Sequence, residues 1–308
     1  MTPCSFSLAA STGCWIRRSG SVAAALDAIF QLGLRRLELN AMTPAQVAEL
    51  PGELARRGMS VQSLHHPCPW PMDPSGEPRR GPEVDGLASP VAEVRSRALS
   101  WARATIDLAH HLGAVAVVLH LGRVEMPAVQ GQLFALLQAG DRQAFAALRD
   151  QACAQRQAAR GPHLRSALAS IRGLGAYAAR AGVALGVEVR DGLHEIPSLA
   201  EFDDVFAATE GLPVYYWHDV GHAEKQQQLG LGSQSQFLRA PGRRLLGVHL
   251  HDCLLDRDHL APGSGQIDLA AVARMLPEGV LRTLELGSQV TMEEAERGLR
   301  LLADLGLA

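Results

Sequence analysis

Carboxylates and histidines of this chain gather where short apolar runs of sequence end. Glu188, Asp219 and Glu285 each stand at the end of such a run. Six of the twelve histidines do the same and two more follow shortly after a run; they are His65, His66, His120, His218, His249 and His251, and then His222 and His259. A charged group at the end of an apolar strand is costly to bury unless it is paired or bound to a metal. The arrangement therefore predicts a metal-binding site.

Strand geometry aligns some of these side chains. The period-two alternation of a strand puts His249 and His251 on one face and aligns Glu188 with Arg190. Each residue alone has a second interpretation, since a single histidine at a strand end is more often a hydrogen-bonded structural residue, and Glu188 can simply pair with Arg190. Four histidines are assigned to a structural class or to the surface, namely His110, His111, His163 and His194. Three carboxylates and several histidines at the ends of predicted strands nevertheless indicate a metal-binding site.

Eight β-rich runs alternate with stretches of helical periodicity, which is the pattern of a barrel. Runs such as Val115–Leu119 are continuously apolar, as expected of parallel strands buried on both faces. The predicted strands are Ser5–Ala9, Arg36–Asn40, Ser60–His65, Ala114–Leu121, Ala184–Val189, Val214–His218, Leu245–His251 and Leu281–Leu286. The predicted helices include Val22–Leu32, Ala45–Arg57, Val91–Leu112, Leu164–Ala181 and Glu293–Leu305. We therefore expect an α/β fold, a single (β/α)₈ barrel over residues 1–308.

Two strand-to-helix connections are long, at about residues 67–90 and 122–162. The first is rich in proline, glycine and charge and has Trp70 near its start, and the second is expected to contain extra helix around Leu133–Leu137 and Asp141–Arg160. Both follow the C-terminal ends of strands, where barrel enzymes place their sites, so they can be lids over an active-site mouth. Ordinary surface decoration is an equally open interpretation.

Composition excludes several classes of function. The net charge is −3, which argues against a protein that grips duplex DNA through many phosphates. Lys225 is the only lysine and lies in a polar stretch without apolar neighbours, so Schiff-base chemistry is not expected. The five cysteines have no CxxC spacing and are expected to be reduced thiols. No apolar run approaches the ~20 residues that span a bilayer, and the first basic residue is Arg17, so we expect a cytoplasmic protein.

A succession of motifs resembles the xylose isomerase-like TIM barrel superfamily, which holds sugar isomerases, sugar phosphate isomerases/epimerases and the endonuclease IV group. The motifs cover about residues 60–290 in the order of the family. They are Leu64-His65-His66-Pro67, Val118-Leu119-His120-Leu121-Gly122, Gly186-Val187-Glu188, His218-Asp219-Val220-Gly221-His222-Ala223, Gly247-Val248-His249-Leu250-His251-Asp252, His259 leading into Pro262-Gly263-Ser264-Gly265-Gln266-Ile267-Asp268, and Leu284-Glu285.

The resemblance implies one divalent metal ion per chain. Its ligands would be Glu188, Asp219, His249 and Glu285, and this oxygen-rich set suits Mn²⁺, Mg²⁺ or Co²⁺, with Zn²⁺ an alternative. It also implies catalysis through a cis-enediolate, with Glu188 and Glu285 as the catalytic residues that remove and return a proton at carbon. The residues implied to contact the sugar are His65, His120, Arg190, His222, His251, His259 and Trp70. The partners would be a small sugar, sugar phosphate or keto-sugar and, as in many relatives, further copies of the chain in a homodimer or homotetramer.

Two other functions stay open. The endonuclease IV branch uses a zinc cluster with additional histidines, which correspond to His65, His120, His222 and His259, so a multi-zinc phosphodiesterase is the alternative. Against it, Asp256 is one residue too far from His259 for the Asp-x-His pair of that branch, which disfavours a complete third metal site. A barrel that binds sugar without catalysis is the other alternative, although all four implied ligands are present.

Overall fold

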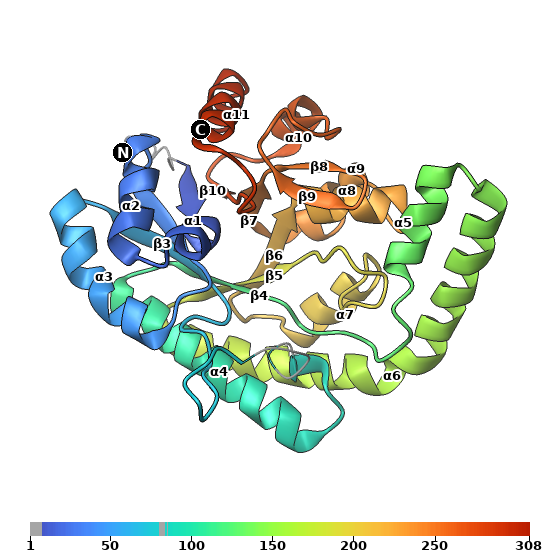
Figure 1. The fold of residues 1–308 in the computed structure, drawn as a ribbon. Helices are drawn as coiled ribbons and strands as arrows, with labels where there is room; N and C mark the ends of the chain where they lie inside the picture. Colours follow the sequence, from blue (N-terminus) through green and yellow to red (C-terminus); the bar gives the residue numbers. More distant parts are fainter. Residues whose placement is uncertain (1–7, 80–83, 85) are drawn as a thin grey trace.

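Eight parallel strands close into a barrel in the computed structural model, which describes residues 8–79, 84 and 86–308 (Figure 1). Around the barrel the order of strands is β1, β10, β7, β6, β5, β4, β3 and β2. Their bounds are β1 Ala9–Ser11, β2 Arg36–Leu39, β3 Ser60–His65, β4 Ala116–Leu119, β5 Ala184–Glu188, β6 Val214–Asp219, β7 Leu245–Leu250 and β10 Leu281–Leu284. The predicted (β/α)₈ barrel is therefore confirmed.

The strand bounds differ from the prediction mainly at the start of the chain. The first strand was expected at Ser5–Ala9, but β1 begins at Ala9, and the part of that prediction before Leu8 lies outside the described residues. Ala9 and Ala10 pair with both β10 and β2, so these residues close the barrel. Pairing on both sides, which local sequence does not reveal, sets the position of this strand.

The helices form the outer layer of the barrel. Their bounds are α1 Gly13–Ser19, α2 Val22–Gln31, α3 Pro44–Arg57, α4 Ala92–Leu112, α5 Gln130–Ala139, α6 Arg142–Ala181, α7 Glu201–Ala208, α8 Val220–Gln228, α9 Gln234–Arg239, α10 Leu269–Met275 and α11 Met292–Asp304. Thr43 and Thr291 begin α3 and α11 with capping boxes, each with a Gln or Glu three residues on. Among the described residues, no helix has the length and apolar character needed to cross a membrane.

The connection over residues 122–162 contains helix, as expected, but its second helix does not stop there. The separate helices predicted at 141–160 and 164–181 are one 40-residue helix, α6, with Pro162 inside it. Proline removes one helical hydrogen bond and usually ends or bends a helix. In Figure 1, the first part of α6 lies beside α5 and, after a bend, the second part lies along α4. Arg156 fixes the first part of α6 to α7, since it donates two hydrogen bonds to the buried carboxylate of Glu201.

A two-stranded antiparallel hairpin, which the sequence did not predict, lies outside the barrel sheet. It consists of β8 (Asp252–Leu254) and β9 (Arg257–Leu260) and follows directly after β7. Its base is fixed by Asp252, whose carboxylate accepts hydrogen bonds from the backbone N–H groups of Cys253, Gly263 and Ile267. The segment between β7 and α10 is thereby held across the mouth of the barrel as one unit.

The interior of the barrel is filled by Trp217. Its indole is fully buried among Ala116, Val118 and Leu281 and packs edge-on against the His249 ring, with 5.2 Å between ring centroids. Glycines on the two neighbouring strands make room for it. A Cβ atom would lie 2.8 Å from the indole at residue 186 and 2.3 Å from it at residue 247.

We expect Gly247→Ala to destabilise the protein, because the new methyl group must displace the Trp217 ring inside a packed barrel. Overpacking of this kind costs about 1–3 kcal/mol in the free energy of unfolding, which chemical denaturation measures. Gly173→Ala is the matched control: residue 173 lies inside α6 with open space around it, so the same change should leave stability unchanged or raise it. Equal effects of the two substitutions would contradict this account of the barrel interior.

Candidate metal centre and polar cavity

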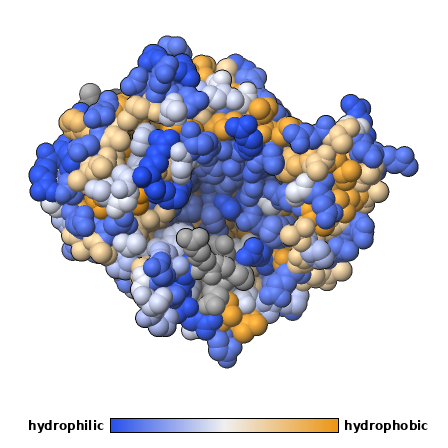
Figure 2. All heavy atoms as spheres, viewed as in Figure 1, coloured by the Kyte–Doolittle hydropathy of each residue, from blue (hydrophilic) through white to orange (hydrophobic). Residues whose placement is uncertain are grey.

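A cavity of about 1020 Å³ opens at the carboxyl ends of the strands. Figure 2 shows a hollow of hydrophilic residues on this face. Its wall combines side chains from barrel strands, from the connection after β3 and from the β8–β9 hairpin. The polar and aromatic residues of the wall include Arg17, Asn40, Thr43, His65, His66, Trp70, His120, Glu188, Arg190, Asp191, His222, Lys225, Asp258, His259, Glu285 and Gln289.

Four potential metal ligands meet at the floor of this cavity. Glu188 ends β5, Asp219 ends β6, His249 lies in β7 and Glu285 follows β10. One ligand atom from each lies within 4.8 Å of the others. The residues are 7% exposed or less, and Asp219 and His249 are completely buried. The barrel thus brings together the four residues that were expected to form one site.

His249 lies at the centre of the group. Its Nδ1 atom is 2.9 Å from Glu188 Oε1, 3.0 Å from Glu285 Oε2 and 3.5 Å from Asp219 Oδ2. Burial alone would lower the pKa of His249, but the surrounding carboxyl groups outweigh burial and raise it well above its usual value. The three distances identify Nδ1 as the ring nitrogen that faces the other three ligands.

The charge of the group fits a divalent cation. Burial by itself raises the pKa of Glu188, Asp219 and Glu285, yet the neighbouring histidines hold each pKa well below its usual range. Three ionised carboxylates thus share a buried space a few ångströms wide, and such charges need cationic compensation. Three carboxylates and one imidazole also match the ligand preferences of Mn²⁺, Mg²⁺ and Co²⁺.

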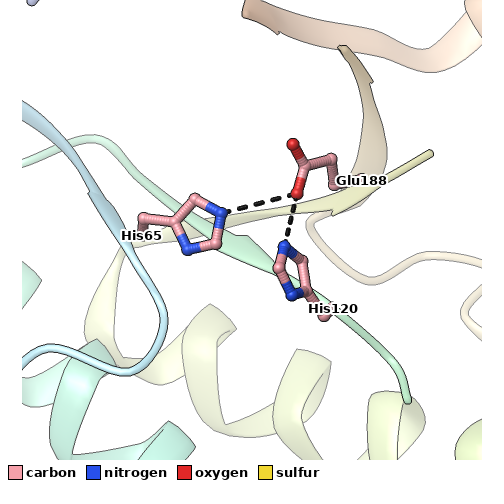
Figure 3. Close-up of side chains that lie close together, drawn as sticks. All are labelled: His65, His120 and Glu188. Carbon is pink, nitrogen blue, oxygen red and sulfur yellow. Dashed lines mark hydrogen bonds and ion pairs between the residues drawn. The ribbon is translucent and has the colours of Figure 1, made fainter. Parts of the chain in front are cut away.

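A second group shares Glu188. His120 Nε2 is 2.6 Å and His65 Nε2 is 3.4 Å from Glu188 Oε2 (Figure 3). His65 Nδ1 lies 3.0 Å from the carbonyl oxygen of His66. A carbonyl only accepts hydrogen bonds, so Nδ1 of His65 carries a proton, and Nε2 is the ring nitrogen that faces Glu188. These three residues also satisfy the spacing of a metal site.

A third group lies under the hairpin and consists of Asp219, His222 and His259. Asp219 is the N-cap of α8 and accepts a hydrogen bond from the His222 backbone N–H at 2.7 Å. His259 has the unusual φ of +54° for a residue with a side chain, and its ring stacks on His251 at 4.3 Å between centroids. Strained backbone of this kind clusters at functional sites. Asp256, in contrast, is exposed and takes no part in this group.

His251 lies behind Asp219 and is absent from the cavity wall. Its Nδ1 accepts from the His259 backbone N–H at 2.9 Å, so the ring proton is on Nε2 and is donated to the Asp219 carboxylate at 3.0 Å. Gly221 permits this packing, because a Cβ atom there would lie 2.1 Å from the imidazole. His251 is therefore placed to orient the Asp219 carboxylate, and it lies outside the cavity in which a contact with substrate was expected.

Arg190 lines the cavity, as expected, but its charge is shared. Its guanidinium lies 3.1 Å from Glu195, 3.6 Å from Glu188 and 3.9 Å from Asp191. Burial would lower the pKa of Arg190, and these carboxylates instead raise it, so the group stays cationic. Three carboxylates compensate this one cation before any ligand arrives.

Lys225 belongs to the cavity wall, which the sequence did not predict. Its ammonium group donates to Asp258 at 2.7 Å and to Asp191 at 3.0 Å. Burial would lower the pKa of Lys225, but the two carboxylates outweigh it and raise the pKa. A lysine held as an ammonium is not a Schiff-base nucleophile. Ion pairing of Lys225 thus disfavours Schiff-base chemistry, whereas the sequence argument rested on the absence of apolar neighbours.

Most of the expected site residues converge. The two expected catalytic residues, Glu188 and Glu285, line the cavity, and the other two expected ligands, Asp219 and His249, lie beneath it. Six of the seven expected sugar contacts also line the cavity, namely His65, Trp70, His120, Arg190, His222 and His259. The sequence analysis missed Glu38, Asn40, Asp191, Lys225 and Asp258. Only Glu38 had a recognisable signal, a carboxylate inside the apolar strand Arg36–Leu39, which is the signal that identified Glu188.

The four histidines that were assigned to structure or surface do not line the cavity. His110 hydrogen-bonds the Ala181 carbonyl oxygen at 2.7 Å, and His111 is exposed beside it at the end of α4. His163 is buried in α6, and the pKa of His194 is lowered, chiefly by burial. His218, although at a strand end, bonds Tyr216 and Gln234 and also lies away from the cavity wall.

The fold keeps His218 neutral. Tyr216 donates its hydroxyl proton to Nδ1 at 2.7 Å, and Nε2–H donates to Gln234 Oε1 at 2.9 Å. Burial lowers the pKa of His218 from 6.5 to about 4. The unfolded chain thus takes up this proton at higher pH than the folded chain. The resulting stabilisation is complete above pH 6.5 and is lost as the pH falls towards 4.

We expect His218→Gln to remove this part of the pH dependence. Between pH 6.5 and 4, in EDTA, the free energy of unfolding of the wild type should fall by on the order of 3 kcal/mol more than that of the variant. Denaturant titrations at a series of pH values measure both slopes. His111→Gln, at the exposed end of α4, serves as the control and should keep the wild-type slope. Identical slopes for wild type and His218→Gln would show the assignment to be wrong.

Comparison with known proteins gives one family and several similar structures. The chain matches the family model of the xylose isomerase-like TIM barrel over residues 24–305. It is similar to an L-ribulose 3-epimerase, with a TM-score of 0.67 and 18% identity over 97% of this chain and 94% of that one. It is similar to the 3-keto-D-glucoside 4-epimerase of E. coli, with a TM-score of 0.65 and 14% identity over 92% and 94%.

A third similar structure is the D-psicose 3-epimerase of Clostridium cellulolyticum H10 with D-tagatose, with a TM-score of 0.63 and 14% identity over 92% of this chain and 93% of that one. None of the curated proteins matches the chain. At these identities, the likeness to solved structures shows a shared barrel fold.

Proposed function

Since the chain belongs to the xylose isomerase-like TIM barrel family, we propose that it is a divalent-metal-dependent sugar isomerase or epimerase. The observation that carries the proposal is the buried group of Glu188, Asp219, His249 and Glu285 at the floor of a polar cavity. The similar solved structures support it, because those named above are epimerases of free sugars or of a keto-glucoside. We include Mn²⁺, Mg²⁺ or Co²⁺ as the ion, a cytoplasmic location and a homodimer or homotetramer in the proposal.

Two carboxylates are placed for proton transfer at carbon. Glu188 and Glu285 are the members of the ligand group that also line the cavity, so they alone combine access to the ion with access to a ligand. Their low pKa values keep them ionised at neutral pH, which a general base requires. Removal of a proton from a hydroxyl-bearing carbon beside a carbonyl gives a cis-enediolate. Return of the proton to the opposite face of the same carbon gives epimerisation, and its return to the neighbouring carbon gives isomerisation. A bound divalent ion supplies Lewis acidity for the charge that develops on oxygen.

The cavity wall suits a neutral polyhydroxy compound. Two cations of the cavity wall, Arg190 and Lys225, are already paired with carboxylates. A phosphate or carboxylate would have to compete with those partners, whereas hydroxyl groups can both donate and accept within the existing network. Trp70, half-buried with its Nε1–H donated to the Arg79 carbonyl oxygen, offers an apolar face for a sugar ring.

A multi-zinc phosphodiesterase is the second candidate, and a specific observation favours it. Among the described residues, the two further groups of potential ligands share Glu188 and Asp219 with the first. Against it, the third group offers only three ligands, since Asp258 is held by Lys225 and Asp256 is remote. The net charge of −3 also lacks the positive balance usual for binding nucleic acid.

We expect Glu285→Gln to abolish proton exchange at carbon while ligand binding is partly retained. A panel of ketoses in D₂O reports the reaction before the substrate is known, because both isomerisation and epimerisation exchange a carbon-bound proton with solvent. Deuterium incorporation is followed by NMR or mass spectrometry, and loss of a general base lowers rates by about 10²–10⁴-fold. Glu278→Gln, an exposed residue before β10, is the control and should exchange at the wild-type rate. Wild-type rates in Glu285→Gln would exclude Glu285 from catalysis.

Metal content separates the two candidate functions. Untagged protein purified without chelator should contain about one Mn, Co or Mg per chain by elemental mass spectrometry, and His120→Ala should still contain one. Two or three zinc ions per chain, with one lost in His120→Ala, would favour the phosphodiesterase and call for assays on abasic-site DNA. A wild-type chain that neither contains metal nor takes it up on titration would refute metal dependence.

A further inference from the structure

Glu38 is a buried carboxyl group outside the four-ligand group that nonetheless touches its central residue. It lies in β2, is 0% exposed and does not line the cavity. Its Oε1 atom is 2.9 Å from Nε2 of His249, on the side of the ring opposite the other ligands. Its Oε2 atom accepts a hydrogen bond from the Ser63 hydroxyl, also at 2.9 Å. Each oxygen of the carboxyl group therefore has one specific partner.

These contacts decide which nitrogen of His249 is available. A neutral imidazole carries its proton on one nitrogen and presents a lone pair on the other. Nδ1 faces Glu188, Asp219 and Glu285, so it must present the lone pair if the four residues share an ion. The proton must then be on Nε2, where a hydrogen-bond acceptor stabilises it. Because Ser63 donates to Oε2, the lone pairs of Oε1 remain for His249.

Ring orientation is fixed by the same contact. The His249 ring rests edge-on against the Trp217 indole, which limits its movement towards the barrel interior. The hydrogen bond from Nε2 to Glu38 sets the rotation of the ring about the Cβ–Cγ bond of His249. Together they aim Nδ1 at the space between the three carboxylates. A carboxylate that orients a metal-binding histidine in this manner also makes the imidazole a stronger donor to the ion.

We propose that Glu38 is a positioning residue of the metal centre, which holds His249 in the Nε2–H tautomer with Nδ1 directed at the ion. The inference rests on the proposed metal-dependent function. Glu38 neither lines the cavity nor belongs to the four ligands, so it would act through His249. Ser63 assists by occupying the other carboxyl oxygen.

The test compares Glu38→Gln with a matched control. Gln has the size of Glu and keeps one acceptor oxygen, but it lacks the charge that strengthens the bond from Nε2–H. The control is Glu53→Gln, which changes another largely buried Glu, one that pairs with Arg57 in α3 at 2.5 Å, away from the cavity wall. Demetallated proteins are titrated with Mn²⁺, and free Mn²⁺ is measured by electron paramagnetic resonance. We expect Glu38→Gln to bind Mn²⁺ about 10- to 100-fold more weakly than wild type and Glu53→Gln to bind it as wild type does.

A second measurement needs only the wild-type chain. Long-range ¹H–¹⁵N NMR of the Zn²⁺-loaded protein identifies the protonated nitrogen of each histidine ring, and the His249 signals are assigned by their loss in His249→Gln. We expect the proton on Nε2. This readout reports the tautomer directly, so it still decides the question if Glu38→Gln fails to fold.

The outcomes are distinguishable. If wild type binds Mn²⁺ and Glu38→Gln binds it equally tightly, the positioning role is wrong and the metal centre stands. A His249 ring protonated on Nδ1 in the Zn²⁺-loaded protein would also overturn the role of Glu38. If wild type binds neither ion, the proposed function fails, and this inference fails with it.

Discussion

Mutual repulsion among buried carboxylates is the constraint on which this structure depends. Glu188, Asp219 and Glu285 approach Nδ1 of one imidazole to between 2.9 and 3.5 Å, in a place that water hardly reaches. Such an arrangement is unfavourable without positive charge, and the low pKa of each carboxyl group shows how strongly the surrounding histidines compensate it. A divalent cation would take over that role and release the protons. The site is therefore built around a charge that the chain itself only partly supplies.

The barrel holds this group from below and the outer elements hold it from above. Trp217 fills the interior directly under His249, where glycines on β5 and β7 leave space for the indole. Above, the β8–β9 hairpin places His259 over His251, and Lys225 joins the hairpin to α8 and to the loop after β5 through its two carboxylate partners. Rigid packing on both sides limits the freedom of the ligands, which is what a preorganised site requires.

The same charges shape the cavity. Arg190 and Lys225, two cations of the cavity wall, each already face at least two carboxylates. The wall around these two residues is consequently rich in hydrogen-bonding groups whose charges are compensated. This charge compensation arises from pairs between elements that are distant in sequence.

The sequence by itself determined the barrel and the residue types of the centre. Parallel strands buried on both faces leave an apolar signature, and a carboxylate or histidine at the end of such a strand stands out against it. Glu188, Asp219 and Glu285 were therefore recognisable as candidates together with several histidines, and the resemblance to the family singled out His249 as the fourth ligand. The tertiary structure alone decided the rest. It made one bent helix of α6 across Pro162, because packing against α4 and α7 outweighs the loss of one helical hydrogen bond. It also turned Lys225 inwards and placed Glu38 behind His249. These contacts join residues up to 211 positions apart, and no local pattern of sequence records which distant side chain will neutralise a buried charge.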